Sequence, residues 1–191
     1  MYCYEIYAIS EVSENMDMVN LYAGDRVKLT GRRAGDDALI ALWYEDSEFA
    51  RNIDTDIAHP KRGSERMTDD GTLFEFMLRL TETDELIGFV AIHSIEWNGR
   101  AGTLSIGIGK PEHRSQGYGS EALRLVLQYA FCELNLHRVG LEVIAYNERA
   151  IRAYKRIGFV EEGRAREYVF RDGKRYDRVS MGLLRRESEW K

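Results

Sequence analysis

The 191-residue sequence contains only two cysteines, Cys3 and Cys132, and they lie far apart in the chain. Two cysteines at this spacing supply neither a disulfide framework nor the clustered ligands of a zinc site. We therefore predict reduced thiols, with Cys132 packed inside a helix, and no bound metal. No apolar run is long enough to cross a bilayer, and the N-terminus lacks the basic region of a secretory signal. These absences predict a cytoplasmic protein with no membrane partner.

The chain also lacks an excess of basic residues. It carries 27 lysines and arginines against 32 aspartates and glutamates, which gives a formal net charge of -5 at pH 7. Nucleic-acid binding requires a basic surface, so this balance argues against a nucleic-acid partner and is compatible with a cationic amine as substrate. With 44% apolar and 31% charged residues, the composition is typical of one globular domain.

An apolar strand ending near Gly109 runs into a glycine-containing turn, residues 114–120, that opens an amphipathic helix. The first amides of a helix have no intrahelical partner and lie at the positive end of its dipole, so they can hold a phosphate. Gly117 and Gly119 carry no β-carbon to keep a phosphate away. Alone, this turn is equally typical of a plain helix entry. One buried helix face is predicted from the apolar spacing of Ala122, Leu123, Val126, Leu127, Ala130 and Phe131.

A second block, residues 147–159, follows a predicted buried strand at 138–146. Asn147 can cap a helix through its side-chain oxygen, and Ala150 and Tyr154 share one helix face because they are four residues apart. Gly158 suits a left-handed C-cap. By residue type alone, Asn147 is a helix cap and Tyr154 is a core or rim residue.

Together, Arg114-x-x-Gly117-x-Gly119 and the pattern Asn-x-x-Ala-x-x-x-Tyr-x-x-x-Gly-Phe of the second block resemble the two coenzyme A elements of the GNAT superfamily of N-acetyltransferases. The C-terminal region resembles the closing hairpin of the branch that includes ribosomal-protein N-terminal acetyltransferases and spermidine acetyltransferases. The resemblance implies the GNAT fold, an α/β (α+β) architecture. Its mixed central sheet of about seven strands is splayed between the fourth and fifth and flanked by helices. We assign residues 25–186 to this domain and residues 1–24 to a leader of unknown structure.

The resemblance also implies acetyl-CoA as co-substrate, with its pantetheine arm lying along a strand. Tyr154 is implied as the general acid that protonates the leaving thiolate. Many relatives carry a glutamate where this chain has Thr103, so the general base is unassigned. The general base would have to be a carboxylate such as Glu45, Asp46 or Glu48, or a water chain. Alternatively, the substrate arrives already neutral. The implied coenzyme-binding residues are Ile106, Ile108, Arg114, Gln116, Gly117, Tyr118, Gly119, Ser120 and Asn147.

By the same resemblance, the acceptor site is lined by Trp43, Tyr44, Glu45 and Tyr168. The implied reaction is direct attack of a primary amine on acetyl-CoA in a ternary complex, the amine being a protein N-terminus or a small molecule. Two alternatives stay open: a polyamine acetyltransferase of the spermidine type, and a catalytically weak coenzyme A-binding sensor or scaffold. A homodimer is the assembly we consider.

Turn residues and periodicity set the remaining elements. Asn98-Gly99 and Asp172-Gly173 are typical of hairpin turns. Residues 54–70 show no clear period and are assigned to a loop or a short helix. Glycine inside a strand is costly, so we attribute Gly107 and Gly109 to the close approach of a ligand or another chain. Strands are expected at 27–33, 73–81, 86–96 and 102–109, with a helix at 36–45 and a short helical continuation or loop at 47–51.

Overall fold

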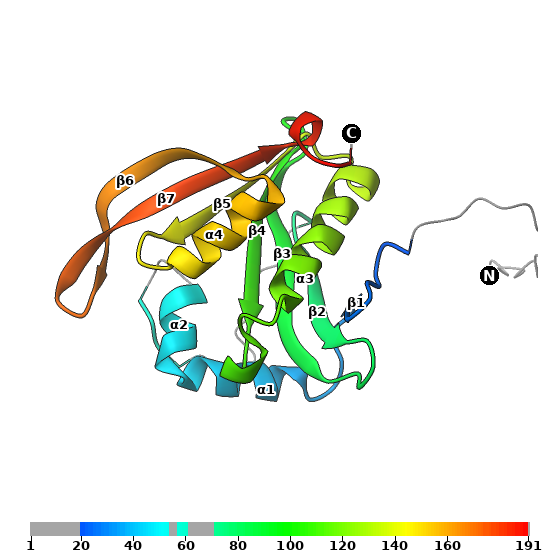
Figure 1. Cartoon of the computed structure of the whole chain (residues 1–191), viewed down its shortest axis with the longest axis horizontal. Helices are drawn as coiled ribbons and strands as arrows, with labels where there is room; N and C mark the ends of the chain where they lie inside the picture. Colours follow the sequence, from blue (N-terminus) through cyan, green and yellow to red (C-terminus); the bar gives the residue numbers. More distant parts are fainter. Residues whose placement is uncertain (1–19, 54–56, 61–70, 191) are drawn as a thin grey trace, which may run out of the picture.

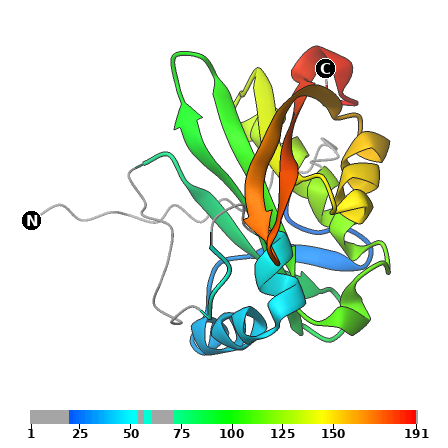
Figure 2. The same cartoon turned by 90° about the vertical axis from the view of Figure 1, so that its left-hand side faces the viewer.

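The computed structural model describes residues 20–53, 57–60 and 71–190. Within these ranges seven strands form one mixed sheet in the order β1-β2-β3-β4-β5-β7-β6. Neighbouring strands are antiparallel except for the parallel pair β4 and β5. Helices α3 and α4 cover one face of the sheet, and α1 and α2 lie at the other side (Figure 1, Figure 2). The predicted fold class is confirmed.

The N-terminal half holds the first four strands and two helices. The predicted strand at 27–33 ends earlier, at Thr30, because the chain turns toward α1, where the Arg33 amide donates to Asp36 Oδ2 at 2.8 Å. The elements are β1 (Val27–Thr30), α1 (Asp36–Glu45), α2 (Ser47–Ile53), β2 (Phe74–Leu80), β3 (Leu86–Glu96) and β4 (Ala101–Ile108).

The C-terminal half supplies the remaining helices and the long closing hairpin. The strand predicted at 138–146 ends at Ile144, because the chain turns there and the Asn147 amide donates to the Ile144 carbonyl. The elements are η1 (Pro111–His113), α3 (Tyr118–Gln128), the π-helix η2 (Tyr129–Glu133), β5 (Arg138–Ile144), α4 (Glu148–Ile157), β6 (Val160–Arg171), β7 (Lys174–Leu184) and η3 (Arg185–Glu187).

Both predicted hairpin turns are confirmed. Residues 97–100 connect β3 to β4, and the turn ends with Arg100 in the left-handed region at φ 49°. Asp172 and Gly173 connect β6 to β7 with φ values of 50° and 71°. Positive φ at both central residues is the requirement of a type I′ turn, which explains the Asp-Gly pair.

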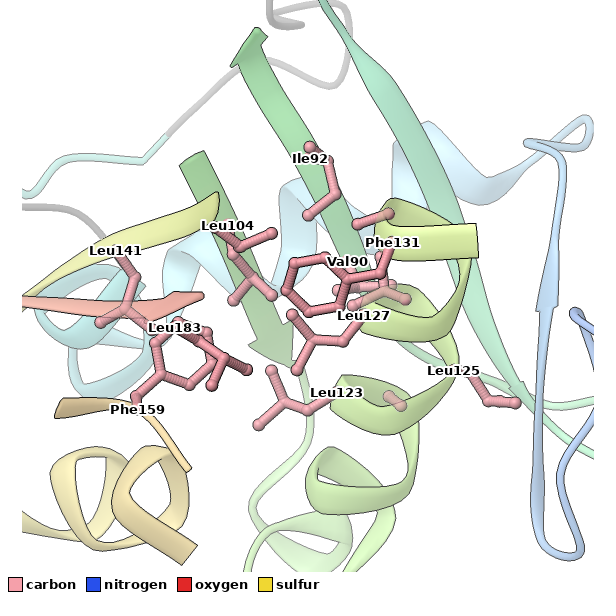
Figure 3. Close-up of a cluster of buried hydrophobic side chains, with 14 of the residues drawn as sticks. Val90, Ile92, Leu104, Leu123, Leu125, Leu127, Phe131, Leu141, Phe159 and Leu183 are labelled. Atoms are coloured by element: carbon pink, nitrogen blue, oxygen red, sulfur yellow. The ribbon is translucent and has the colours of Figure 1, made fainter. Parts of the chain in front are cut away.

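The main core lies between the sheet and α3 (Figure 3). The predicted apolar face of α3 is buried there against Val90, Ile92 and Leu104. The packing prediction for Cys132 is wrong: its thiol is free and exposed. In the π-helix it is Ala130 and Phe131 that are buried, so the next residue along the chain faces solvent.

A smaller cluster on the other face packs α1 and α2 against the sheet and explains Gly107 in β4 and Gly109 just after it. A β-carbon on Gly109 would lie 2.1 Å from Trp43 Cε2, and one on Gly107 would lie 2.8 Å from Ile53 Cδ1. The close neighbours of these glycines are therefore side chains of α1 and α2. The attribution of both glycines to an approaching ligand is wrong for this reason.

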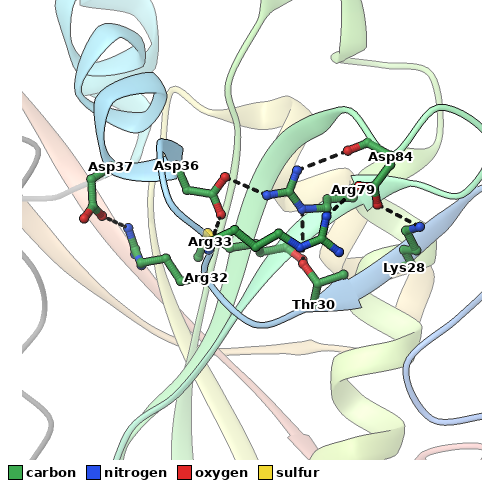
Figure 4. Close-up of polar contacts among 9 residues, drawn as sticks. Lys28, Thr30, Arg32, Arg33, Asp36, Asp37, Arg79 and Asp84 are labelled. Atoms are coloured by element: carbon green, nitrogen blue, oxygen red, sulfur yellow. Dashed lines mark hydrogen bonds and ion pairs between the residues drawn. The ribbon is translucent and has the colours of Figure 1, made fainter.

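Polar contacts fix the start of α1 to the edge of the sheet (Figure 4). Arg79 Nη2 lies 2.6 Å from Asp36 Oδ1, and both side chains are almost fully buried. At the surface beside this pair, Asp84 accepts from Lys28 at 2.8 Å and from Arg33 at 2.5 Å. These three ion pairs connect the start of α1 to β1, to β2 and to the turn after β2.

Part of the predicted leader packs on the domain. The ring of Tyr22 lies 6.3 Å from that of Phe76 and 6.1 Å from that of Tyr129, centroid to centroid. Residues 1–19 of the leader, and the loop predicted at 54–70 except for residues 57–60, lie outside the described residues. None of the helices in the described ranges is long and apolar enough to cross a membrane.

Candidate active site

The parallel strands β4 and β5 pair only at one end. The register joins Ala101 to Arg138 and Thr103 to Gly140, and no pairing continues beyond it. From Leu104 onward β4 and β5 diverge, as Figure 1 shows. The predicted splay between the fourth and fifth strands is confirmed, and it leaves the main chain of β4 open to a ligand on that side.

A first cavity of about 510 Å³ lies in this splay. Its walls come from α2, β4, the turn before α3, the first turn of α3, β5 and α4. The structure therefore brings together eight predicted residues from β4 and from the two separate motifs. They are Ile106, Ile108, Arg114, Gly117, Gly119, Ser120, Asn147 and Tyr154.

One end of the first cavity is the N-terminus of α3. Gly117 has φ 89°, a left-handed conformation that favours glycine, and its carbonyl accepts from the amides of Ser120 and Glu121, each at 3.1 Å. Across the described part of the chain, the main-chain amides of Gly117, Tyr118 and Gly119 have no hydrogen-bond partner. Free amides at the positive end of a helix suit an anionic group.

Gln116 and Tyr118 do not line this cavity, and Arg26 explains why. Arg26 Nη1 donates to the Gln116 carbonyl at 2.9 Å, and its guanidinium lies 4.3 Å from the centre of the Tyr118 ring. Both residues thus contact the segment that precedes β1. Sequence reasoning missed Arg26, because a single arginine before a strand carries no recognisable pattern.

Arg114 lines the first cavity, but the structure commits its guanidinium to neighbours. Nη2 donates to Asp46 at 2.9 Å, Nε donates to the Ile108 carbonyl at 3.3 Å, and Nη1 lies 3.2 Å from Glu48. The hydrogen bond from Arg114 lowers the pKa of Asp46. These contacts give Arg114 a positioning role, and they make Asp46 a poor proton acceptor.

Asn147 and Tyr154 come from the second motif. Asn147 Oδ1 accepts from the Ala150 amide at 3.2 Å and so caps α4, while Gly158 ends the helix at φ 111°. Burial raises the pKa of Tyr154 to about 12. The phenol therefore stays protonated at neutral pH and can act as a proton donor. Three arginines of α4 also line the first cavity: Arg149, Arg152 and Arg156.

A second cavity of about 680 Å³ involves the other face of the sheet. Four residues line both cavities, namely Ile53, Leu104, Ser105 and Glu142, so the two cavities adjoin at the splay. Sequence reasoning missed His93, which lines the second cavity from β3. The alternation of β3 was the available signal, since it predicts that His93 lies on the face opposite Ile92. The further lining includes Glu96, Thr103, Arg138, Gly140 and Ser180.

None of the four predicted acceptor residues lines either cavity. Trp43 is buried against Gly109, and Tyr44 packs edge-on against Phe49 with centroids 5.2 Å apart. Glu45 is exposed, and Tyr168 is exposed on β6 beneath the guanidinium of Arg178. In place of α1, it is α2 that borders the cavities, because the two-helix unit buries its first helix in the smaller core cluster. The closing hairpin borders the second cavity through Ser180 and Met181 of β7 and not through Tyr168.

Comparison with known proteins identifies the family. Residues 26–160 match the family model described as an acetyltransferase (GNAT) domain. The uncharacterized N-acetyltransferase p20 of Bacillus licheniformis is 28% identical over 178 residues, which span 89% of this chain and 98% of that protein. The spermidine N(1)-acetyltransferase of Vibrio cholerae is 36% identical over 99 residues, 52% of this chain and 57% of that one.

A solved structure gives the same result for the fold. The crystal structure of spermidine N-acetyltransferase from Vibrio cholerae in complex with CoA and spermine superposes with a TM-score of 0.76 at 26% identity. The match covers 84% of this chain and 96% of that one. The splayed sheet and the match over most of the chain lead to one conclusion: this chain belongs to the GNAT acetyltransferase family and is an N-acetyltransferase.

Proposed function

We propose that the chain transfers the acetyl group of acetyl-CoA to a primary amine by direct attack in a ternary complex. The observation that carries this proposal is the meeting of the two cavities at the splay. One cavity carries free amides for a coenzyme at the N-terminus of α3, and the other gives an amine access from the opposite face. Ser105 and Leu104 line both, so the reacting atoms meet beside them.

The coenzyme is placed by donors on three elements. The free amides of Gly117 and Gly119, which line the first cavity, hold the diphosphate, assisted by the positive end of the α3 dipole. The pantetheine arm lies along the unpaired side of Ile106–Ile108, where it takes the place of a neighbouring strand. Arg149 and Arg152 on α4 add positive charge at the cavity wall.

The chemistry follows from thioester aminolysis. A primary ammonium loses one proton, its nitrogen attacks the thioester carbonyl, and the carbon–sulfur bond breaks in the tetrahedral intermediate. Tyr154 gives its proton to the departing thiolate and recovers one from the nitrogen of the new amide. A phenol whose pKa is raised to about 12 holds its proton until sulfur accepts it.

A polyamine is the second candidate for the acceptor, and the charge of the second cavity favours it. Glu96 and Glu142 line this cavity beside Arg138, whose charge is paired with Glu162, and Glu48 lines the adjoining one. Carboxylates spaced along a cavity suit a chain with several ammonium groups. The spermine in the structure of the Vibrio cholerae relative supports the same candidate. A protein N-terminus would present a single ammonium and needs fewer of these carboxylates.

The test is release of coenzyme A thiol from acetyl-CoA with a panel of amines. The panel contains spermidine, a short peptide with a free N-terminus and a simple alkylamine, each measured against an amine-free blank. Release with at least one amine supports acetyl transfer, and release with spermidine alone supports the polyamine candidate. Binding of acetyl-CoA with no release for any amine would contradict the proposal and favour a sensor or scaffold.

A further inference from the structure

His93, Thr103 and Ser105 lie on one face of the sheet. The antiparallel register of β3 and β4 places Ala91 opposite Ser105 and His93 opposite Thr103. Alternation along both strands then directs these side chains away from the core that α3 covers. All three line the second cavity, and Ser105 also lines the first. The imidazole of His93 therefore reaches the junction of the two cavities through one intervening side chain, that of Ser105.

The imidazole of His93 is held by two hydroxyl groups. Nε2 lies 2.8 Å from Ser105 Oγ, and Nδ1 lies 3.0 Å from Ser94 Oγ. Ser94 adopts a left-handed conformation at φ 51°, which a serine adopts only where the surroundings impose it. A hydroxyl both donates and accepts, so these partners accommodate the neutral and the protonated ring. Burial lowers the pKa of His93, which leaves the ring neutral and able to accept a proton at neutral pH.

The other ionisable groups at the second cavity are less suited to this step. Of the described residues that line it, Glu96, Arg138 and Glu142 are the charged ones. Glu142 is paired with Arg178 of β7 at 3.1 Å, and Arg138 is paired with Glu162 of β6. Glu96 is exposed at the end of β3, and the hydrogen-bond partner of Ser105 Oγ is His93. His93 is the group in hydrogen-bond contact with the residue that both cavities share.

We propose that His93 accepts the proton of the acceptor ammonium through the hydroxyl of Ser105. The ammonium donates to Ser105 Oγ while the Ser105 hydroxyl proton passes to His93 Nε2, which leaves a neutral amine and an imidazolium. The amine then attacks the thioester, and His93 releases its proton to solvent after the products leave. This relay rests on the proposed function. It supplies the general base that Thr103, which carries no carboxylate, cannot supply.

The relay is tested with two variants and one control. His93→Gln keeps a polar side chain of similar length but cannot take up a proton, and Ser105→Ala removes the bridge. His137→Gln is the control, because that histidine is exposed in the loop before β5. Each protein is compared in thermal unfolding, in affinity for acetyl-CoA by calorimetry, and in kcat and KM with the amine that the wild type acetylates fastest.

A proton relay and a structural contact predict different results. The relay predicts a fall in kcat of about 100-fold or more in both variants, with the acetyl-CoA affinity unchanged. It also predicts a change in pH dependence between about pH 6 and about pH 9. The wild-type rate levels off above the pKa of His93, whereas the His93→Gln rate keeps rising because the free amine must come from solution. The control retains the wild-type values.

Two results would overturn the relay, and they are distinguishable. If His93→Gln and Ser105→Ala fold, bind acetyl-CoA and keep the wild-type kcat and pH profile, the relay is wrong while acetyl transfer stands. If the wild type binds acetyl-CoA and releases no thiol with any amine, the proposed function fails and the relay fails with it. If His93→Gln does not fold, Ser105→Ala decides between these outcomes. Alanine is smaller than serine and fits at this half-buried position, so this variant should fold.

Discussion

Arg114 Nη2 lies 2.9 Å from Asp46 Oδ2, which ties the junction of α1 and α2 to the end of β4. Arg114→Ala also leaves the carbonyls of Ile108 and Gly109 without this donor. We expect the free energy of unfolding to fall by about 2 kcal/mol, because buried acceptors lose their partner. Arg124→Ala removes an exposed arginine paired with Glu189, and its effect should stay within about 0.5 kcal/mol. Equal unfolding midpoints of Arg114→Ala and Arg124→Ala in denaturant would contradict the positioning role of Arg114.

The buried pair of Asp36 and Arg79 gives a larger effect. Asp36→Ala leaves a nearly buried guanidinium without its carboxylate and removes the acceptor of the Arg33 amide. We expect a loss of about 3–5 kcal/mol in the free energy of unfolding. Glu82→Ala, at an exposed position in the nearby turn, is the control. A loss no greater than that of the control would mean that the pair does not hold α1.

Acid should weaken the ion pairs that Asp84 makes with Lys28 and Arg33 at the surface. Hydrogen bonds from Lys28 and Arg33 lower the pKa of Asp84 from 3.8 to about 2, so its carboxyl binds a proton less readily in the folded chain than in the unfolded chain. Its contribution to stability is therefore complete above about pH 4 and is lost as the pH falls toward 2. Denaturant unfolding of wild type and Asp84→Asn should differ above this window and converge below it. A difference that does not depend on pH would contradict the assignment.

Gly109 tests the packing of α1 directly. A β-carbon at this position would overlap Trp43, so Gly109→Ala should lower the free energy of unfolding by about 3 kcal/mol. Gly163→Ala is the matched control, because a β-carbon there meets no atom within 4 Å. Thermal unfolding of the two variants gives the comparison. If both behave alike, Trp43 does not occupy the position described.

Tyr154 tests the chemistry of the leaving group. Tyr154→Phe keeps the ring and its contact with Phe159 but removes the proton donor. We expect kcat to fall by about 100-fold and the dissociation constant for acetyl-CoA to stay within about twofold of wild type. Steady-state kinetics and calorimetry on the same preparation provide the two values. Unchanged kcat would remove Tyr154 from the reaction.

Much of the fold could be predicted because local patterns and tertiary structure agree. The apolar spacing on α3, the Asp172-Gly173 turn and the Gly158 cap each require one local conformation, and the structure has all three. Cys132 was misplaced because its residue type suggested packing, whereas the predicted apolar face ends at Ala130 and Phe131, which are the buried residues of the π-helix. The homodimer, the cytoplasmic location and the leader stay predictions.

The candidate site could be predicted only in part, for a physical reason. Its coenzyme side is built from two contiguous motifs, each of which forms one turn and one helix. Its acceptor side is built by strand register, which brings His93 to Ser105 from positions 12 residues apart. Trp43 was misplaced for a similar reason, because it packs against Gly109, a residue that follows β4 and lies far from Trp43 in the sequence.

The most direct test of acetyl-CoA binding at the N-terminus of α3 is calorimetry of wild type and Gly119→Asp. A β-carbon at Gly119 has ordinary space beside Ile108, and a carboxylate in the first helical turn stabilises the helix, so this variant should fold as well as wild type. We expect saturable binding of acetyl-CoA by wild type and at least ~10-fold weaker binding by Gly119→Asp, because its carboxylate repels the diphosphate. No binding by the folded wild type, or equal affinity of the two proteins, would contradict a coenzyme site at this helix end.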